Sequence, residues 1–408
     1  FAKAGHTSAE LFNAISAEAV RRRLGGFSPQ HLLNTAWAFA KAGHRSVELF
    51  NAISSEVVCR RLGDFNPQDL SNMPWAFATA GHASAELFNV ISAEILRRRL
   101  GGFSPQHLSN TAWAFAKAGH TSAELFNAIS AEVVHRRLGD FDMQHLCNTA
   151  WAFATTGRAS HALFNAISAE MLLRQLGDFN PHDLSTTAWA FAAAGHASAE
   201  LFDAISAEIL RRRLSGFNSQ HLSNTAWAFA TAGHASAELF DAISAKAVRQ
   251  QLGDFDAQHL SNTAWAFATA GHASAELFNA ISAEVVHRRL SGFNAQALSN
   301  LAWAFAVFNP LSADDVFGTT VFSTRCAHFE TAFSRSDLSQ LHQWSNWRVE
   351  RGAQWPGLPE SLRQACHEVF VSREARPSQL QRDVVREIRS HDVHVKEEHR
   401  CKVSGYSI

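Results

Sequence analysis

The feature that most constrains this chain is a nine-residue segment around Trp37 that recurs every 38 residues. The segment runs from Leu32 to Ala40. Near copies surround seven further tryptophans: Trp75, Trp113, Trp151, Trp189, Trp227, Trp265 and Trp303. A fixed period of this length is typical of repeat architectures. The chain is therefore expected to fold as a row of near-identical units, and its function must be one that such a row can perform.

Each repeat is predicted to be a hairpin of two helices. Ser28 and Pro29 suit an N-cap and a first helical residue, and Gly43 suits a stop. A second helix is predicted to begin at Ser46 and to end at Gly63, with Leu62 among its apolar residues. One hairpin cannot bury both of its faces, so neighbours must stack. We expect an all-α fold, a right-handed α-solenoid, with a short α/β start at the C-terminus.

The pattern fails after Trp303, which divides the chain. Residues 1–305 are predicted to be an array of about eight repeats, and 306–335 a capping helix region in which Ser312–Asp315 forms a capping box. Residues 336–390 are predicted to be helical. Residues 391–408 alternate in a strand-like way and are predicted to begin a truncated α/β element.

The first helix of each repeat has a core face and a polar face at 100° per residue. The core face carries Leu32, Ala36, Phe39 and Ala40, and the opposite arc carries Gln30, Asn34, Ala38 and Lys41. Trp37 lies between the two arcs. It either packs within and between repeats or offers a platform on which nucleic-acid bases stack.

Stacked repeats would turn the polar face into a ladder of amides. Its members are Gln30, Asn34, Gln68, Asn72, Gln106, Asn110, Gln144, Asn148, Gln220, Asn224, Gln258, Asn262, Gln296 and Asn300. Amides both donate and accept, so the ladder either joins adjacent repeats or reads the edges of RNA bases. These residues are the candidate base-contacting set.

The second helix carries Glu18 and Arg22 in the favourable order for an i,i+4 ion pair. The pair recurs along the array, and in one repeat both members change together, to Lys246 and Gln250. This joint replacement indicates that the two side chains touch and that this arginine row is structural. Other basic residues are candidate phosphate contacts, or simply favourable charges at helix C-termini: Lys41, Lys117, Arg23, Arg61, Arg99, Arg137, Arg213 and Arg289.

Composition narrows the remaining classes of function. The formal net charge of −1 gives no overall basic excess, so nucleic-acid binding must depend on local patches. The five cysteines are scattered without a CxxC pair, which argues against a disulfide framework or a zinc site. The recurring histidines such as His44 are expected to have loop or capping roles. We expect no metal, no cofactor, no catalytic residues and no transmembrane helix.

The repeat resembles the octotricopeptide repeat in its Leu-Ser-Asn-Thr-Ala-Trp-Ala-Phe-Ala motif, as at Leu108–Ala116. The segments Leu338–Trp344, Pro359–Arg363, Pro377–Gln381 and Gly405–Ile408 resemble the region that precedes a RAP domain in FAST-kinase-like proteins. The resemblance implies organellar RNA binding, in mRNA stability, transcript or rRNA processing, or translation. It implies a mitochondrial location, or alternatively a plastid one, and no kinase activity.

The implied partners are single-stranded RNA and other organellar RNA-processing proteins, without a membrane or a small-molecule substrate. Because Phe1 falls inside a repeat, we expect a fragment whose targeting peptide is not included. Two alternatives remain. One is a protein-binding α-solenoid scaffold without RNA contact. The other is an enzyme whose catalytic domain, such as a nuclease-like RAP domain, follows Ile408.

Overall fold

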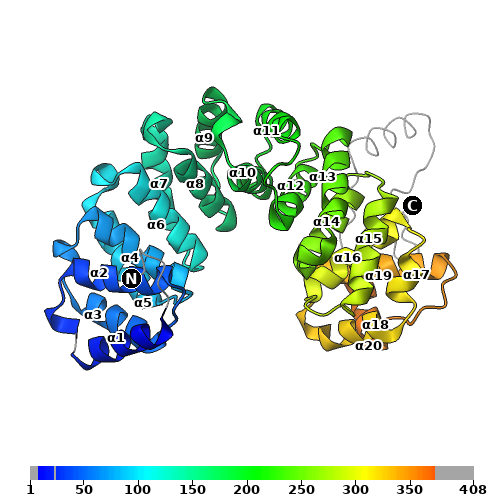
Figure 1. Cartoon of the computed structure of the whole chain (residues 1–408), viewed down its shortest axis with the longest axis horizontal. Helices are drawn as coiled ribbons and strands as arrows, with labels where there is room; N and C mark the ends of the chain where they lie inside the picture. The colour runs from blue at the N-terminus through cyan, green and yellow to red at the C-terminus, as the bar shows by residue number, and fades with distance from the viewer. Residues whose placement is uncertain (1–7, 23, 373–408) are drawn as a thin grey trace, which may run out of the picture. The chain divides into compact units, whose positions relative to one another are not determined.

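The computed structural model describes residues 8–22 and 24–372. Within these residues it contains twenty α-helices, short 3-10 helices and no strand, which confirms the predicted all-α repeat fold. The chain divides into two compact units, Phe1–Arg212 and Arg213–Ile408, and each is described by itself (Figure 1). The predicted α/β element at 391–408 lies outside the described residues.

Unit 1 alternates first and second helices of the repeats. Its first helices are α2 (Pro29–Lys41), α4 (Pro67–Ala80), α6 (Pro105–Lys117), α8 (Met143–Thr155) and α10 (Pro181–Ala193). Its second helices are α1 (Ala9–Arg21), α3 (Val47–Cys59), α5 (Ala85–Arg98), α7 (Ala123–His135), α9 (His161–Leu173) and α11 (Ala199–Arg211). Five 3-10 helices connect one repeat to the next: η2 (Leu24–Gly26), η3 (Leu62–Asp64), η4 (Leu100–Gly102), η5 (Leu138–Asp140) and η6 (Leu176–Asp178).

Unit 2 continues the same alternation and then departs from it. Its first helices are α12 (Ser219–Thr231), α14 (Ala257–Thr269), α16 (Ala295–Phe308) and α19 (Arg335–Glu350). Its second helices are α13 (Ala237–Arg249), α15 (Ala275–His287) and the short α17 (Ala313–Phe317). The remaining elements are η7 (Leu252–Asp254), α18 (Thr320–His328), η8 (Glu330–Ala332) and α20 (Glu360–Val371).

Three of the four start and stop signals predicted for α2 and α3 agree with the structure. Ser28 caps α2, Ser46 caps α3, and Gly43 adopts a left-handed φ of 65° that a residue with a Cβ rarely takes. The prediction that the second helix continues to Gly63 is wrong, because α3 ends at Cys59. Leu62 is buried in η3 instead, so it packs from a tighter turn that leads into the next repeat.

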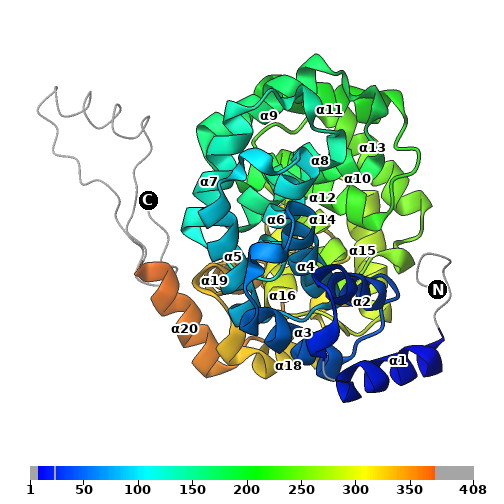
Figure 2. The same cartoon turned by 90° about the vertical axis from the view of Figure 1, so that its left-hand side faces the viewer.

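The helices of each unit form two layers. In unit 1, α2, α4, α6, α8 and α10 pack side by side in chain order, and the second helices form a looser row, which Figure 2 shows for α5, α7 and α9. The apolar core lies between the layers. There Phe50 of α3 meets Phe77 of α4 edge to face at 4.9 Å. The four predicted core residues of α2 are all buried, which confirms the assignment of its faces.

The capping region contains one wrong prediction. Ser312 begins α17, but its side chain does not cap that helix. Its hydroxyl instead accepts a hydrogen bond of 2.8 Å from Ser282 of α15, as the corresponding serines do between earlier repeats. The segment therefore acts as a shortened second helix. After it, α19 packs on α16 as one first helix packs on the next, so α19 acts as a ninth first helix, within the stretch that was predicted to be helical.

Candidate nucleic-acid interface

The glutamine row lies on the solvent side of the first-helix layer. All seven predicted members are exposed, and each sits in the first turn of its helix. In the fifth first helix, α10, His182 takes this position and is also exposed. The wheel therefore placed this row on the correct side of the helix. The side chains are spaced one repeat apart within each unit and are accessible to a ligand.

The asparagine row lies beside the glutamines but is less accessible. Asn34 is exposed, Asn72, Asn110, Asn148, Asn224 and Asn262 are half-buried, and Asn300 is buried. Asn110 donates a hydrogen bond of 3.3 Å to Asn72, and Asn300 donates one of 3.4 Å to Asn262. At these places the amides join adjacent repeats. Each such amide keeps further donor and acceptor capacity, because it can take part in up to four hydrogen bonds.

The tryptophans form a third row on the same layer. Ring centroids of neighbours lie 6.2 Å apart for Trp113 and Trp151, and 6.5 Å apart for Trp227 and Trp265. The planes are tilted by 35° and 30° in these two pairs. A base inserted between two rings needs roughly 7 Å between parallel planes, about twice the 3.4 Å base step. The rings therefore pack on one another, and any base would have to contact their exposed edges.

Exposed carboxylates are missing from the first helices of the array. From α2 to α16 these helices contain two acidic residues, Asp69 and Asp183, with 5% and 8% of their surface exposed. Both are engaged at helix N-termini, where each accepts the backbone N–H of its N-cap asparagine. Lys41 and Lys117 are exposed at the C-terminal ends of α2 and α6. The exposed side of the first helices from α2 to α16 is thus neutral to basic, and the exposed carboxylates nearest to the glutamine row are those of the N-cap residues Asp142 and Asp256.

Several histidines in the first turns of the first helices have a capping role that the sequence analysis missed. His107 Nδ1 accepts the backbone N–H of Ser104 at 3.2 Å, while the Ser104 hydroxyl accepts the His107 N–H at 3.3 Å. The same reciprocal pair occurs at Asp142 and His145. Burial lowers the pKa of His107, which favours the neutral ring that this acceptor role requires. A Ser-x-x-His spacing was the available signal.

The inter-helix histidines join consecutive repeats. His82 Nε2 lies 3.0 Å from the side-chain oxygen of Asn51, and the His82 ring packs against Phe50 at 5.6 Å. His44 makes the same kind of contact with Asn13 at 2.9 Å. The predicted loop or capping role was therefore too narrow, because these rings bridge one repeat to its neighbour.

The structural arginine row is confirmed and reaches further than predicted. Arg60 Nε donates to Glu56 at 2.6 Å, as expected from the i,i+4 spacing. Its other nitrogens donate to three carbonyls of the preceding repeat, those of Phe27, Leu24 and Gly25, at 2.5, 2.9 and 2.9 Å. We call this arrangement the arginine clamp. It recurs at Arg98, Arg136, Arg174, Arg212 and Arg288.

The predicted phosphate arginines belong to the second-helix layer. Arg61, Arg99, Arg137, Arg213 and Arg289 are exposed just after the second helices, and Arg23 lies outside the described residues. Arg99 lines a hollow between α5 and α7, and Arg289 lines one beside α15, α17 and α18. The amide rows lie on the other layer. The structure therefore brings Gln106, Asn110 and Trp113 to one surface, and Arg99 to a different one.

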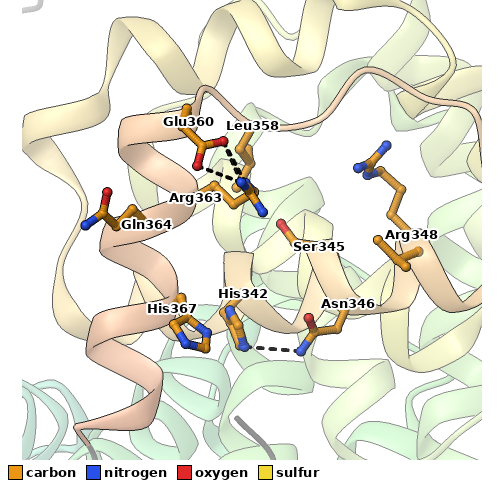
Figure 3. A pocket seen from close by; sticks show the side chains of 10 residues that line it. His342, Ser345, Asn346, Arg348, Leu358, Glu360, Arg363, Gln364 and His367 are labelled. Carbon is orange, nitrogen blue, oxygen red and sulfur yellow. Dashed lines mark hydrogen bonds and ion pairs between the residues drawn. The ribbon is translucent and has the colours of Figure 1, made fainter. Parts of the chain in front are cut away.

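A separate polar cavity of about 310 Å³ lies between α19 and α20 (Figure 3). His342 and His367 approach from the two helices with ring centroids 5.3 Å apart, and His342 Nε2 lies 3.1 Å from Asn346 Nδ2. At the other end of the cavity Arg363 pairs with Glu360. Across residues 8–22 and 24–372, no three His, Cys, Asp or Glu side chains converge in a way that would hold a metal ion.

The sequence analysis also predicted that the chain has no transmembrane helix. None of the helices within residues 8–22 and 24–372 combines the length and the apolar character needed to cross a bilayer.

Comparison with known proteins gives one family. A family profile described as RNA-editing substrate-binding complex 6 protein matches residues 65–341, which is more than half of the chain. No curated protein sequence matches. Among solved structures, the crystal structure of an engineered protein is 18% identical, over 93% of this chain and 100% of that one, with a TM-score of 0.38.

Proposed function

Because this chain belongs to the RNA-editing substrate-binding complex 6 protein family, we propose that it binds single-stranded RNA as part of an RNA-processing assembly. The contact surface is the exposed side of the first-helix layer. The observation that carries the proposal is the recurrence there of exposed glutamines beside half-buried asparagines, on helices whose two carboxylates are buried. Amides recognise base edges, and the first helices from α2 to α16 carry no exposed carboxylate of their own apart from the N-cap residues Asp142 and Asp256, so phosphates can approach most of the row.

The glutamines are the better base contacts of the two amide rows. They are exposed, whereas Asn110 hydrogen-bonds to Asn72 and Asn300 hydrogen-bonds to Asn262. Lys41 and Lys117 on the same layer would meet phosphates and give binding its salt dependence. If one repeat contacts one base, then near-identical repeats favour an RNA of low sequence complexity.

Finer features of the proposal depend on the sequence resemblance. They are membership of the octotricopeptide-repeat and RAP-domain group, action in the mitochondrion, and a role in mRNA stability, transcript processing or translation. We also propose that the chain acts by binding and not as an enzyme, with no cofactor.

The test is RNA binding by the full chain, measured by fluorescence anisotropy with a labelled single-stranded RNA at two salt concentrations. The variant Gln106→Ala/Gln144→Ala/Gln220→Ala/Gln258→Ala removes four exposed amides. We expect RNA affinity to fall about tenfold or more, because a good amide-to-base contact contributes about 1–3 kcal/mol. The thermal unfolding midpoint should hardly change, because exposed substitutions typically alter stability by less than about 0.5 kcal/mol.

The matched comparison is the variant with Asn110, Asn148, Asn224 and Asn262 changed to Ala, which should lose both affinity and stability. If the glutamine variant binds RNA as tightly as the wild type, the amide-row proposal is wrong. If the wild-type chain retains no RNA at either salt concentration, the result favours the protein-binding scaffold.

A further inference from the structure

The cavity between α19 and α20 lies where the ninth first helix departs from the repeat. The N-caps Asn294 of α16 and Ser334 of α19 align the two helices at a spacing of 40 residues. At this spacing Ser345 stands at the position of Phe305, a fully buried ring that packs against Phe278 of α15. Because Ser345 lines the cavity, a small hydroxyl replaces a large apolar ring there and leaves a space of about 310 Å³.

Two further polar residues of α19 stand where α16 has alanine. His342 and Asn346 occupy the positions of Ala302 and Ala306, and both line the cavity. His342 is only 5% exposed, and its ring lies 5.3 Å from that of His367 on α20. Burying an imidazole and an amide costs free energy unless other polar groups meet them. This face of α19 thus carries polar groups that the packing of α16 does without, which is what a ligand site requires.

The other end of the cavity carries charged groups. Arg348 of α19 donates from Nη1 to the Trp355 carbonyl at 2.5 Å, and its guanidinium makes no other hydrogen bond to the described residues. Arg363 of α20 holds the carboxylate of Glu360 through Nε and Nη2 at 3.0 and 2.6 Å. The carboxylate of Glu368 accepts a glutamine amide at 2.9 Å and does not line the cavity. Two guanidinium groups therefore face one carboxylate, which leaves one positive charge in excess.

These groups restrict the class of ligand. Figure 3 shows Ser345 on the α19 side of the cavity, with Arg363 to one side and Arg348 to the other. A hydroxyl and two guanidinium groups are donors suited to phosphate oxygens. A metal ion is disfavoured, because no three metal-ligating side chains converge anywhere in residues 8–22 and 24–372. The volume falls near the lower end of the roughly 300–1,000 Å³ that small-ligand sites occupy, which suits a single nucleotide.

We propose that this cavity binds a ribonucleoside 5′-phosphate, either as a free nucleotide or as the 5′ end of an RNA. The phosphate accepts hydrogen bonds from Ser345 and Arg348, and a ribose hydroxyl donates to Glu360. The base lies against His367 with its edge toward Asn346. The site is separate from the amide rows, so it holds its ligand whether or not those rows contact RNA.

The experiment measures binding of AMP and UMP to the full chain by isothermal titration calorimetry. Adenosine and uridine lack the phosphate, and inorganic phosphate lacks the nucleoside. We expect both nucleotides to bind at least about tenfold more tightly than any of these three, because phosphate and nucleoside each add contacts and the phosphate contacts are charge-assisted. The trinucleotide UpUpU with and without a 5′-phosphate identifies the source. Tighter binding of the phosphorylated trinucleotide than of UMP assigns an RNA end, whereas tighter binding of UMP assigns a free nucleotide.

Two variants test the cavity itself. Arg363→Gln should weaken AMP binding about tenfold or more, because it removes a charged donor and leaves the Glu360 carboxylate unpaired beside the phosphate. Arg363 is exposed, so this variant should stay folded. Ser345→Phe restores the residue of the array, fills the cavity and should abolish AMP binding, with circular dichroism confirming that the chain is folded. The control Arg289→Gln removes an exposed positive charge of unit 2 outside the cavity and should bind AMP as the wild type does.

The proposal is overturned if neither the nucleotides nor the phosphorylated trinucleotide binds, or if adenosine binds as tightly as AMP. It is also overturned if Arg363→Gln or folded Ser345→Phe keeps its AMP affinity. Polyglutamate serves as a competitor, and displacement of AMP by an equal concentration of it would show a general anion site and contradict the proposal. The variant that lacks four glutamines of the amide row should bind AMP normally, so failure of the amide row and failure of this site give separate results.

Discussion

The two layers of each unit are held together by different means. First helices lie close because small buried residues face their neighbours, as Ser109, Thr111 and Ala112 do in α6. Second helices touch one another much less, and six of them are tied through an arginine clamp to the loop of the preceding repeat. The difference shows that dense packing keeps the first-helix rows regular, whereas hydrogen bonds at the helix ends leave hollows between second helices.

The largest expected effect on stability comes from removing one arginine clamp. Arg288→Ala should lower the free energy of unfolding by about 3 kcal/mol, because it leaves a half-buried carboxylate and three carbonyls without their donor. Arg288 binds Glu284 at 2.5 Å and the carbonyls of Phe255, Leu252 and Gly253 at 2.6, 3.2 and 2.9 Å. Urea titration followed by circular dichroism measures the change.

The adjacent residue supplies the control for the clamp. Arg289 is exposed and has no partner among the described residues, so Arg289→Ala should change the free energy of unfolding by less than about 0.5 kcal/mol. Both variants remove one positive charge from the same place in the sequence. Equal losses would show that the clamp adds nothing beyond charge, and the contrast between the layers would fail.

A smaller change in the free energy of unfolding is expected in the repeat whose sequence lacks the clamp arginine. In the repeat with Lys246 and Gln250, Gln250 Nε2 still donates to the Phe217 carbonyl at 3.0 Å, so one of the clamp contacts is kept. Lys246→Glu/Gln250→Arg should restore the complete clamp and raise the free energy of unfolding by about 1 kcal/mol. A double-mutant cycle measures the coupling. Additive single effects would mean that the two positions do not interact.

Much of the fold follows from the sequence because the repeat supplies its own internal comparison. The period, the serine caps and the glycine stops fix the hairpins, and the paired change at Lys246 and Gln250 indicates that positions four apart on the second helix touch, as Glu56 and Arg60 do. The end of the second helix was misplaced by a few residues. Leu62 keeps the apolar spacing although the backbone has already tightened into η3, so periodicity alone could not locate the boundary.

The candidate site could be predicted only one helix at a time. A helical wheel correctly puts Gln106 opposite the core, but it does not relate that face to the end of a neighbouring helix. It therefore could not show that Arg99 belongs to the second-helix layer. The carbonyl partners of Arg60 lie 33 to 36 residues earlier, in the preceding loop, where no sequence pattern marks an acceptor. Because every residue carries a backbone carbonyl, the sequence does not indicate which of them accepts a hydrogen bond from Arg60.

The smallest expected effect is a loss of stability at acidic pH. The hydrogen bond from Arg97, reinforced by that from Arg98, lowers the pKa of Glu94 from its ordinary 4.5 to about 2 against the opposing effect of burial. A lowered folded-state pKa stabilises the protein fully above pH 4.5, and this stabilisation is lost as the pH falls from there toward 2. Among the described residues, the first helices have no comparable carboxylate–arginine pair, so acid should loosen the second-helix layer before the first-helix layer.

The substitution Glu94→Gln tests this expectation, because it removes the titrating group and leaves the side chain's shape. Thermal unfolding midpoints of the wild type and the variant, measured from pH 7 to pH 2, should differ most at neutral pH. The difference should begin to narrow below pH 4.5 and should close toward pH 2, where the folded-state carboxylate of the wild type becomes protonated. A constant difference across the whole range would mean that the Glu94 carboxylate contributes no pH-dependent stability. The arginine clamps would then not depend on their acidic partners.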